Sequence, residues 1–229
     1  MIQKDLFPQV SGRIGTDESG KGDYFGPLVV AGIYLPEGQD EVLRELGVRD
    51  SKRISDQKVK ELASIIKKGY VQATVTIGPA RYNELYERMR NLNRLLAWAH
   101  ARVIEDLLSQ VPCSLVITDQ FGDEFYIRQA LMKLGQKVEL IQRVKAEEDV
   151  AVAAASILAR AEFLNRLEKL SQEVGLELPK GSSPLAEKIG FELVSRFGQD
   201  ILNKVAKKHF KLTAKILNLL EEKDNCQSS

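Results

Sequence analysis

Apolar and polar residues alternate along the chain in patterns that predict a mixed α/β protein. Apolar stretches at 13–17 and 27–35 predict two neighbouring strands, and alternation over 70–77 predicts a third. Shorter runs at 114–118 and 137–143 predict two more strands, the last of them edge-like. Helical spacing of apolar residues predicts helices at 55–68, 79–90, 91–110, 124–134, 149–174, 185–197, 199–206 and 209–222.

The order of these elements indicates the fold class. Three early strands followed by alternating helices and strands are typical of a mixed sheet with helices on both faces. The first half of the helix at 149–174 is rich in alanine, which permits close packing on the sheet. We expect a short lead-in over 1–12, one domain over 13–222 and a disordered tail over 223–229.

The stretch from Ile14 to Pro27, IGTDESGKGDYFGP, carries the first candidate chemistry. A strand ends in two acids, and a glycine-rich turn containing Lys21 leads into the next strand. Such a turn beside carboxylates suggests a metal and a phosphate backbone, although a polar hairpin turn is the simpler alternative. A nucleotide-binding P-loop is disfavoured, because Gly22 stands where Ser or Thr would bind magnesium and because a strand follows instead of a helix.

Further acids stand where predicted elements begin or end. Asp119 ends the strand at 114–118, and 147–149 reads Glu-Glu-Asp before the long helix. Strand ends at one edge of a sheet can converge, and clustered carboxylates repel unless a cation is present. Oxygen ligands favour magnesium or manganese over zinc. Taken alone, Asp119 is explained as a loop acid and Asp149 as a helix N-cap.

Composition narrows the function only slightly. The 229 residues are 44% hydrophobic, enough for a sizeable core, and 33 Lys and Arg nearly cancel 32 Asp and Glu, for a net charge of +1. Any nucleic-acid surface must therefore be local. Two cysteines do not make a zinc site. The start lacks the apolar core of a signal peptide, and no stretch is apolar enough to cross a membrane, so we expect no membrane partner and a cytoplasmic protein.

The segment 17–26, DESGKGDYFG, resembles the signature of bacterial ribonuclease HIII, which has G-K-G where ribonuclease HII usually has G-R-G. The resemblance continues in order through 50–52, 91–93, 118–121, 145–147, 154–160, 178–181 and 209–210. It implies a ribonuclease H-like fold with a mixed five-stranded sheet flanked by helices and a C-terminal helical extension. It also implies a metal-dependent endonuclease, with Mg²⁺ or Mn²⁺ as cofactor and two ions present when substrate is bound. These relatives usually carry an N-terminal substrate-binding domain, for which 1–12 leaves no room, so either the protein lacks it or it was removed.

The resemblance also assigns residues to roles. It makes Asp17, Glu18, Asp119 and Glu147 both catalytic residues and metal ligands, with Glu147 the least secure because two further acids follow it. A hybrid is distinguished from DNA at the 2′-OH, which backbone groups can reach where side chains are absent. The residues expected to bind substrate are Ser19, Gly20, Lys21, Gly22, Lys52, Asn93, Ser156, Arg160 and Lys180.

Several of these residues have simpler explanations. Asn93 could cap a helix, Ser156 could be a small packing residue, and Arg160 could be a surface charge. Four later lysines could hold distant phosphates, although a solvated helix face is the favoured explanation for each: Lys207, Lys208, Lys211 and Lys215. We expect His100 to be structural, on a packed helix.

We therefore expect a monomeric endonuclease that cleaves the RNA strand of RNA–DNA hybrids, leaving 5′-phosphate and 3′-hydroxyl ends. The alternative is a catalytically weak hybrid-binding module. Ribonuclease HII recognises a single ribonucleotide partly through a tyrosine, and Val174 stands at that position in the similar segment VGLELPKGS. The six tyrosines all fall at or before Tyr126. We expect cleavage within runs of ribonucleotides to be preferred over cleavage at a lone one.

Overall fold

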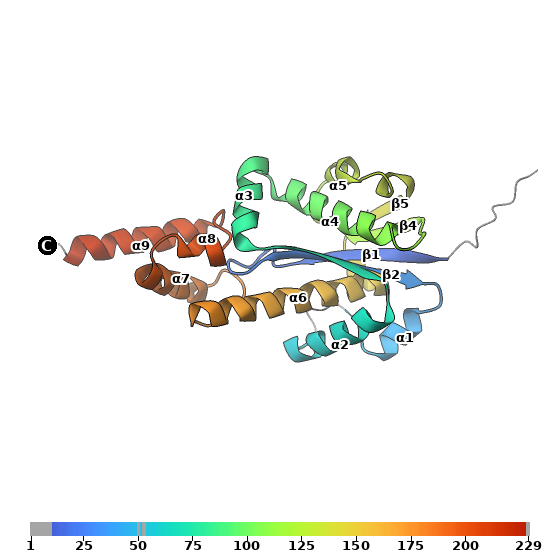
Figure 1. Ribbon diagram of the computed structural model, residues 1–229, viewed down its shortest axis with the longest axis horizontal. Helices are drawn as coiled ribbons and strands as arrows, with labels where there is room; N and C mark the ends of the chain where they lie inside the picture. The colour runs from blue at the N-terminus through green and yellow to red at the C-terminus, as the bar shows by residue number, and fades with distance from the viewer. Residues whose placement is uncertain (1–10, 50, 52–53, 228–229) are drawn as a thin grey trace, which may run out of the picture.

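The computed structural model describes residues 11–49, 51 and 54–227, and its centre is a five-stranded sheet in the order β3-β2-β1-β4-β5 (Figure 1). The strands are β1 (Gly12–Ser19), β2 (Leu28–Pro36), β3 (Gln72–Ile77), β4 (Leu115–Asp119) and β5 (Glu139–Arg143). β1, β2 and β3 pair antiparallel, whereas β4 runs parallel to β1 and β5 parallel to β4. The predicted mixed sheet is confirmed, with β5 at its edge.

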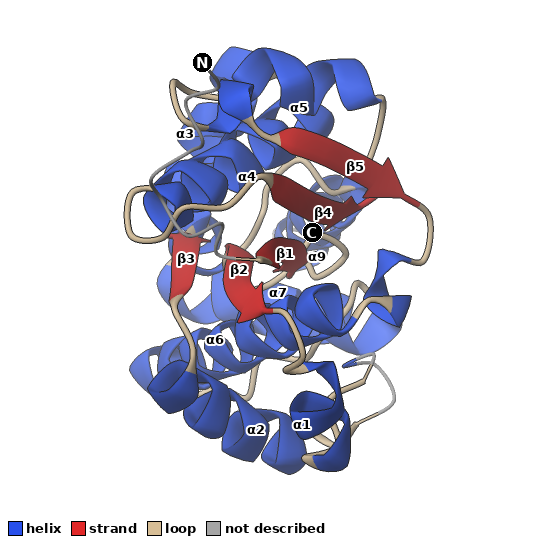
Figure 2. Ribbon diagram, turned by 90° about the vertical axis from the view of Figure 1, so that its right-hand side faces the viewer, coloured by secondary structure: helices blue, strands red, loops and turns tan. Residues whose placement is uncertain are grey.

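Helices cover both faces of the sheet (Figure 2). One face carries α1 (Asp40–Glu45), α2 (Asp56–Gly69) and α6 (Val150–Val174), and the other carries α3 (Pro79–Met89), α4 (Leu92–Leu108) and α5 (Glu124–Ala130). Two 3₁₀ turns flank β5, η2 (Gly135–Lys137) and η3 (Ala146–Glu148). The C-terminal helices lie together beyond one end of the sheet as α7 (Pro184–Phe197), α8 (Ile201–Val205) and α9 (Lys211–Gln227).

Two glycines in the central strands let helices approach both faces. A Cβ on Gly15 of β1 would lie 2.3 Å from the carbonyl carbon of Ala151, at the start of α6. A Cβ on Gly32 of β2 would lie 2.6 Å from the Val103 Cγ1 atom, on α4. Larger side chains at these positions would push α6 and α4 away from the sheet, together with the residues that these helices bring to the site.

The ends of α6 follow from local chemistry. The Asp149 side chain accepts a 2.9 Å hydrogen bond from Ala151 N, which confirms the expected N-cap, and Arg13 Nε pairs with the same carboxylate at 2.8 Å. The helix ends at Gly175, whose φ of 67° lies in the left-handed region that glycine tolerates. The helix that carries two predicted substrate-binding residues is thus fixed at both ends.

Three expectations about the elements need correction. The short helix α1 was not predicted. The helix expected over 124–134 ends at Ala130, because the amides of Leu134 and Gly135 bond to the Glu105 carboxylate of α4 instead of continuing a helix. The tail expected from residue 223 is helical to Gln227, the end of α9. No helix in the described ranges is long and apolar enough to span a bilayer.

Candidate active site

One pocket lies where β1 and β4 end, and it brings together most of the predicted site residues. Its lining contains all four predicted acids, which we call the acid cluster: Asp17, Glu18, Asp119 and Glu147. The remaining lining residues are Ser19, Gly20, Lys21, Gly22, Asp23, Ser51, Arg160, Phe163, Leu164 and Lys180. The acid cluster therefore faces the glycine turn and three basic side chains across a single pocket.

Strand geometry places the acids on both sides of the sheet edge. Successive side chains of a strand point to opposite faces, so Glu18 leaves β1 toward α4 and Asp17 leaves it toward α6. The Glu18 amide donates to Asp17 Oδ1 at 2.8 Å. Asp119 Oδ1 accepts from the amide of Ala146 at 3.1 Å, which ties the turn carrying Glu147 to the end of β4. Three separate elements, β1, β4 and η3, thus bring the acids to the pocket.

Glu18 is largely enclosed, with a side chain only 10% exposed. Its Oε2 lies 3.3 Å from His100 Nε2, and its Oε1 lies 3.3 Å from Lys21 Nζ. Burial raises the pKa of Glu18, but the contacts with His100 and Lys21 outweigh burial, so the pKa lies below its ordinary value. His100 was expected to be purely structural, and its contact with Glu18 was missed because 82 residues separate the two.

The donor chemistry of the acid cluster fits a divalent cation. All four side chains offer carboxylate oxygens, the ligands that Mg²⁺ and Mn²⁺ prefer. Within the described residues, no group of three or more His, Cys, Asp or Glu side chains already stands where it would hold an ion. The carboxylates share a pocket without forming a closed ligand set, and their mutual repulsion favours a cation between them.

The two glycines that flank Lys21 in the turn beside the cluster have different surroundings. Gly20 has a φ of 88°, and a Cβ there would lie 2.2 Å from the Pro27 oxygen, so the backbone itself demands glycine. A Cβ on Gly22 would meet nothing within 4 Å, so that glycine leaves open space over the backbone. Between them, the Lys21 side chain is 40% exposed. The turn presents bare backbone and one cation to whatever enters the pocket.

Segments from the far end of the chain hold this turn in place. Gly181 N donates to Asp23 Oδ1 at 2.6 Å, and Tyr24 N donates to Gly181 O at 2.9 Å. Gly26 N donates to Val205 O at 2.9 Å. Asp23, which had no predicted role, thus connects the turn to the loop before α7.

Lys207 adds a buried cation beneath the turn. Its side chain is fully buried, and Nζ donates to Gly26 O at 2.7 Å and to the oxygens of Phe25 and Pro27 at 3.3 and 3.4 Å. Burial lowers the pKa of Lys207 to about 7, opposed by the charge of Asp23. The expectation that Lys207 holds a phosphate or lies on a solvated face is wrong, because its ammonium serves carbonyls inside the protein.

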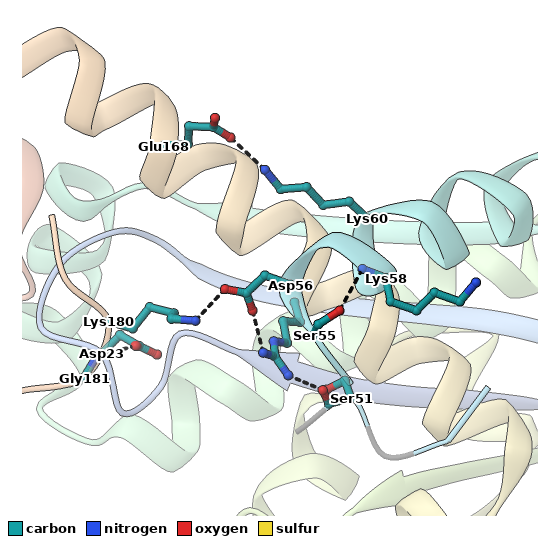
Figure 3. A network of polar contacts seen from close by, with 10 residues as sticks. Asp23, Ser51, Ser55, Asp56, Lys58, Lys60, Glu168, Lys180 and Gly181 are labelled. Atoms are coloured by element: carbon teal, nitrogen blue, oxygen red, sulfur yellow. Dashed lines mark hydrogen bonds and ion pairs between the residues drawn. The ribbon is translucent and has the colours of Figure 1, made fainter. Parts of the chain in front are cut away.

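Arg160 and Lys180 line the pocket and share Asp56 as a partner, and we call these three residues the cation rim. Figure 3 shows Asp56 beside Lys180. The Asp56 carboxylate receives Arg160 Nη2 at 2.5 Å and Lys180 Nζ at 2.6 Å. Arg160 also donates to the carbonyl oxygen of Ser51. Burial raises the pKa of Asp56, but the hydrogen bonds from Lys180 and Arg160 outweigh it and lower the pKa. Two predicted substrate-binding residues are therefore already held by one aspartate.

Two of the predicted substrate residues that the structure describes, Ser156 and Asn93, do not line the pocket. Ser156 is buried and donates to Ala153 O at 2.9 Å, so it is the small packing residue of the alternative explanation. Asn93 lies in the first turn of α4, where Asn91 and not Asn93 supplies the capping side chain. Lys52 lies outside the described residues.

The sequence is similar to a family model and to named proteins that are described as ribonucleases H. The family model described as Ribonuclease HII matches residues 14–213. A protein of Protochlamydia amoebophila named Ribonuclease HIII is 50% identical over 213 residues, covering 93% of this chain and 69% of its own length. One of Chlamydia muridarum with the same name is 44% identical over 219 residues, covering 94% of this chain and 71% of its own.

Solved structures agree with the sequence relatives. The Mn²⁺ complex of Bst-RNase HIII superposes with a TM-score of 0.83 at 31% identity, over 92% of this chain and 71% of that one. The ribonuclease H2 of Pyrococcus horikoshii superposes with a TM-score of 0.74 at 25% identity, over 90% and 96% of the two chains. The sheet and its flanking helices are thus shared with both types of structure.

Proposed function

The chain belongs to the ribonuclease HII family and is a metal-dependent ribonuclease H, and we propose that it hydrolyses the RNA strand of RNA–DNA hybrids to 5′-phosphate and 3′-hydroxyl ends. The observation that carries this proposal is the single pocket that joins the acid cluster to a bare glycine turn and to basic side chains. This combination suits a phosphodiester beside a divalent ion, because carboxylates hold the cation while N–H groups and cations hold the phosphates.

In this proposal the acid cluster supplies the metal ligands, Asp17, Glu18, Asp119 and Glu147, for Mg²⁺ or Mn²⁺. When bound, a pair of such ions activates a water and stabilises the leaving oxygen of the phosphodiester. The proposal is supported by the all-oxygen donor set and by the similarity to a ribonuclease HIII whose structure contains Mn²⁺. Residues of the chain hold the carboxylates in place for the cation. The amide of Ala146 bonds to Asp119, and the side chains of His100 and Lys21 contact Glu18.

Substrate recognition is proposed for the opposite wall of the pocket. The backbone of Ser19, Gly20 and Gly22 meets the ribose 2′-OH, where the absence of side chains allows a close approach. Lys21 contacts the adjacent phosphate, and the cation rim contacts phosphates further along the strand. This division assigns chemistry to the acids and positioning to the cations.

The direct test is incubation of an end-labelled RNA–DNA hybrid with the protein and Mg²⁺ or Mn²⁺. We expect internal cleavage of the RNA strand, no cleavage of a DNA duplex of the same sequence, and no cleavage in EDTA. A ligase that requires 5′-phosphate and 3′-hydroxyl ends should rejoin the products across the DNA strand. Tight hybrid binding without cleavage in either metal would favour the alternative, a hybrid-binding module.

We also propose that the enzyme prefers runs of ribonucleotides. A tyrosine ring can stack on the sugar at a junction, whereas Val174, its counterpart here, cannot. Val174 ends α6, and the pocket lining contains neither it nor a tyrosine. Two duplexes of equal length, one with several consecutive ribonucleotides and one with a single ribonucleotide, test this in Mg²⁺ at low salt. Comparable cleavage rates on both duplexes would show that Val174 does not decide the specificity.

A further inference from the structure

His100 makes an unusual set of contacts for a core histidine. It lies on α4 with a fully buried side chain. Its Nδ1 is 2.9 Å from Thr16 Oγ1 and 3.4 Å from Thr118 Oγ1, and its Nε2 is 3.3 Å from Glu18 Oε2. The ring also stacks on Phe121 with a centroid separation of 4.7 Å and an interplanar angle of 19°. All polar atoms of the imidazole therefore meet residues at the ends of β1 and β4.

The partners fix which nitrogen carries a proton in the neutral ring. A carboxylate can only accept, so Nε2–H donates to Glu18. Nδ1 then carries the lone pair and accepts from the hydroxyl of Thr16, with that of Thr118 at longer range. One imidazole is thus held on one side by hydroxyls and directs its only N–H at the carboxylate.

The position of these hydroxyls relates them to the acids. Thr16 and Thr118 are direct partners in the parallel β1–β4 pairing, and each stands one residue before an acid, Asp17 and Asp119. A side chain that bridges both threonines fixes the register of the two strand ends that deliver the acids. Phe121, two residues beyond Asp119, covers the ring and keeps the following loop against it.

We propose that His100 is a positioning residue of the acid cluster, which orients Glu18 for a divalent ion and aligns the ends of β1 and β4. This inference rests on the proposed function. The two oxygens of Glu18 have different partners: the one facing His100 meets a fully buried ring, whereas the other meets Lys21, whose side chain is 40% exposed. His100 therefore keeps its oxygen while the oxygen facing Lys21 is the one released to a cation.

The test uses two substitutions that divide the contacts of the ring. In His100→Gln the amide nitrogen takes about the place of Nε2 and can still donate to Glu18. In His100→Asn the amide reaches only the place of Nδ1 and can contact Thr16 but not Glu18. Binding of MnCl₂ alone, without nucleic acid, is measured by isothermal titration calorimetry. We expect Asn to weaken Mn²⁺ affinity by about 10–100-fold, as partners of metal ligands typically do, and Gln to restore most of it.

A third variant, Leu107→Ala, matches the loss of core packing on the same buried face of α4 without touching the acids. It should lower thermal stability and leave Mn²⁺ affinity unchanged. With saturating metal, His100→Asn should lower kcat on a hybrid and leave KM unchanged. Wild-type affinity in His100→Asn, or equal losses in the Gln and Asn variants, overturns the inference. Failure of the wild-type protein to bind Mn²⁺ or to cleave a hybrid overturns the proposed function instead.

Discussion

The acid cluster and the cation rim face the same pocket but are held in opposite ways. The acids are held by backbone amides and by the buried ring of His100, and the Glu18 side chain is only 10% exposed. The rim is held by ion pairs, in which the side chains of Asp56 and Lys180 are 40% and 50% exposed.

The acid cluster and the cation rim should therefore respond differently to substitution. Buried polar contacts are expensive to break, because the group left behind loses its partner away from water. Exposed ion pairs contribute only about 0–1 kcal/mol, so their members exchange partners readily. A substitution among the acids should therefore change the rate of cleavage, and a substitution in the rim should change affinity and its dependence on salt.

The largest effect is expected from Asp119→Asn. The amide keeps the shape of the side chain but lacks the charge that a divalent ion requires, so kcat should fall by more than about 100-fold, beyond what loss of an outer partner costs. Hybrid affinity, measured by fluorescence anisotropy, should be largely retained. Asp123→Asn is the matched control, since Asp123 caps α5 on the same loop and asparagine caps equally well. Near-normal cleavage by Asp119→Asn would remove this acid from the site.

A second set of substitutions decides the fourth acid. Glu147 lines the pocket, Glu148 is exposed, and Asp149 caps α6 and pairs with Arg13. Glu147→Gln should lower kcat severely, by at least the roughly 100-fold that loss of an outer partner can cost, while Glu148→Gln and Asp149→Asn should change it little. A severe loss in Glu148→Gln would instead make Glu148 the ligand.

Much of the fold could be predicted because its elements carry strong local patterns. The strands and the alanine-rich α6 are confirmed to within a few residues, since alternation and apolar runs survive whatever surrounds them. The short helix α1 was missed because it buries only Leu43. The early end of α5 depends on Glu105, a residue of α4 about 30 positions away, and no local pattern contains that contact.

The residues of the site also differ in how well the sequence could predict them. Asp17, Glu18 and the glycines after them could be predicted because they are adjacent in the sequence, whereas Asp119 and Glu147 were assigned through the resemblance. The supports could not be predicted, since His100 meets Glu18 across 82 residues and Lys207 meets Phe25 across 182. Ser156 and Arg160 share one helix face in sequence, but only Arg160 reaches the pocket, because Ser156 turns its hydroxyl back to its own helix. Residues with reactive side chains can be recognised in the sequence more easily than the buried residues that hold them in place.

Lys207 is the buried counterpart of the half-exposed Lys180. Its pKa is lowered to about 7 in the folded protein, against about 10.4 for an unperturbed lysine. Between these values the unfolded chain binds more protons, so the free energy of unfolding should rise with pH, by up to about 1.4 kcal/mol per unit. Lys207→Met should remove this contribution. Urea unfolding at pH 7 and pH 9 measures it as the difference between wild type and variant.

The matched control is Lys208→Met, whose exposed side chain neighbours Lys207. It should show the same pH dependence as the wild type, which separates the buried ammonium from other groups that titrate in this range. A wild-type slope that persists in Lys207→Met would show that the ammonium stays charged on its carbonyls at pH 9.

The smallest effect is expected from Asp56→Asn, and its sign tests the rim directly. Losing the pair with Lys180 should cost little positioning, because exposed pairs contribute only about 0–1 kcal/mol, and the less exposed Arg160 keeps its hydrogen bond to the Ser51 carbonyl. Losing the negative charge frees Arg160 and Lys180 for phosphates, so KM for a hybrid should fall a few-fold at low salt, and the salt dependence should steepen by up to about one counterion. Glu61→Gln removes one charge from the same helix at an exposed pair with Lys58 and should change neither quantity. A rise in KM would mean that Asp56 is needed to hold the cations in place, and that the rim is as dependent on fixed geometry as the acid cluster.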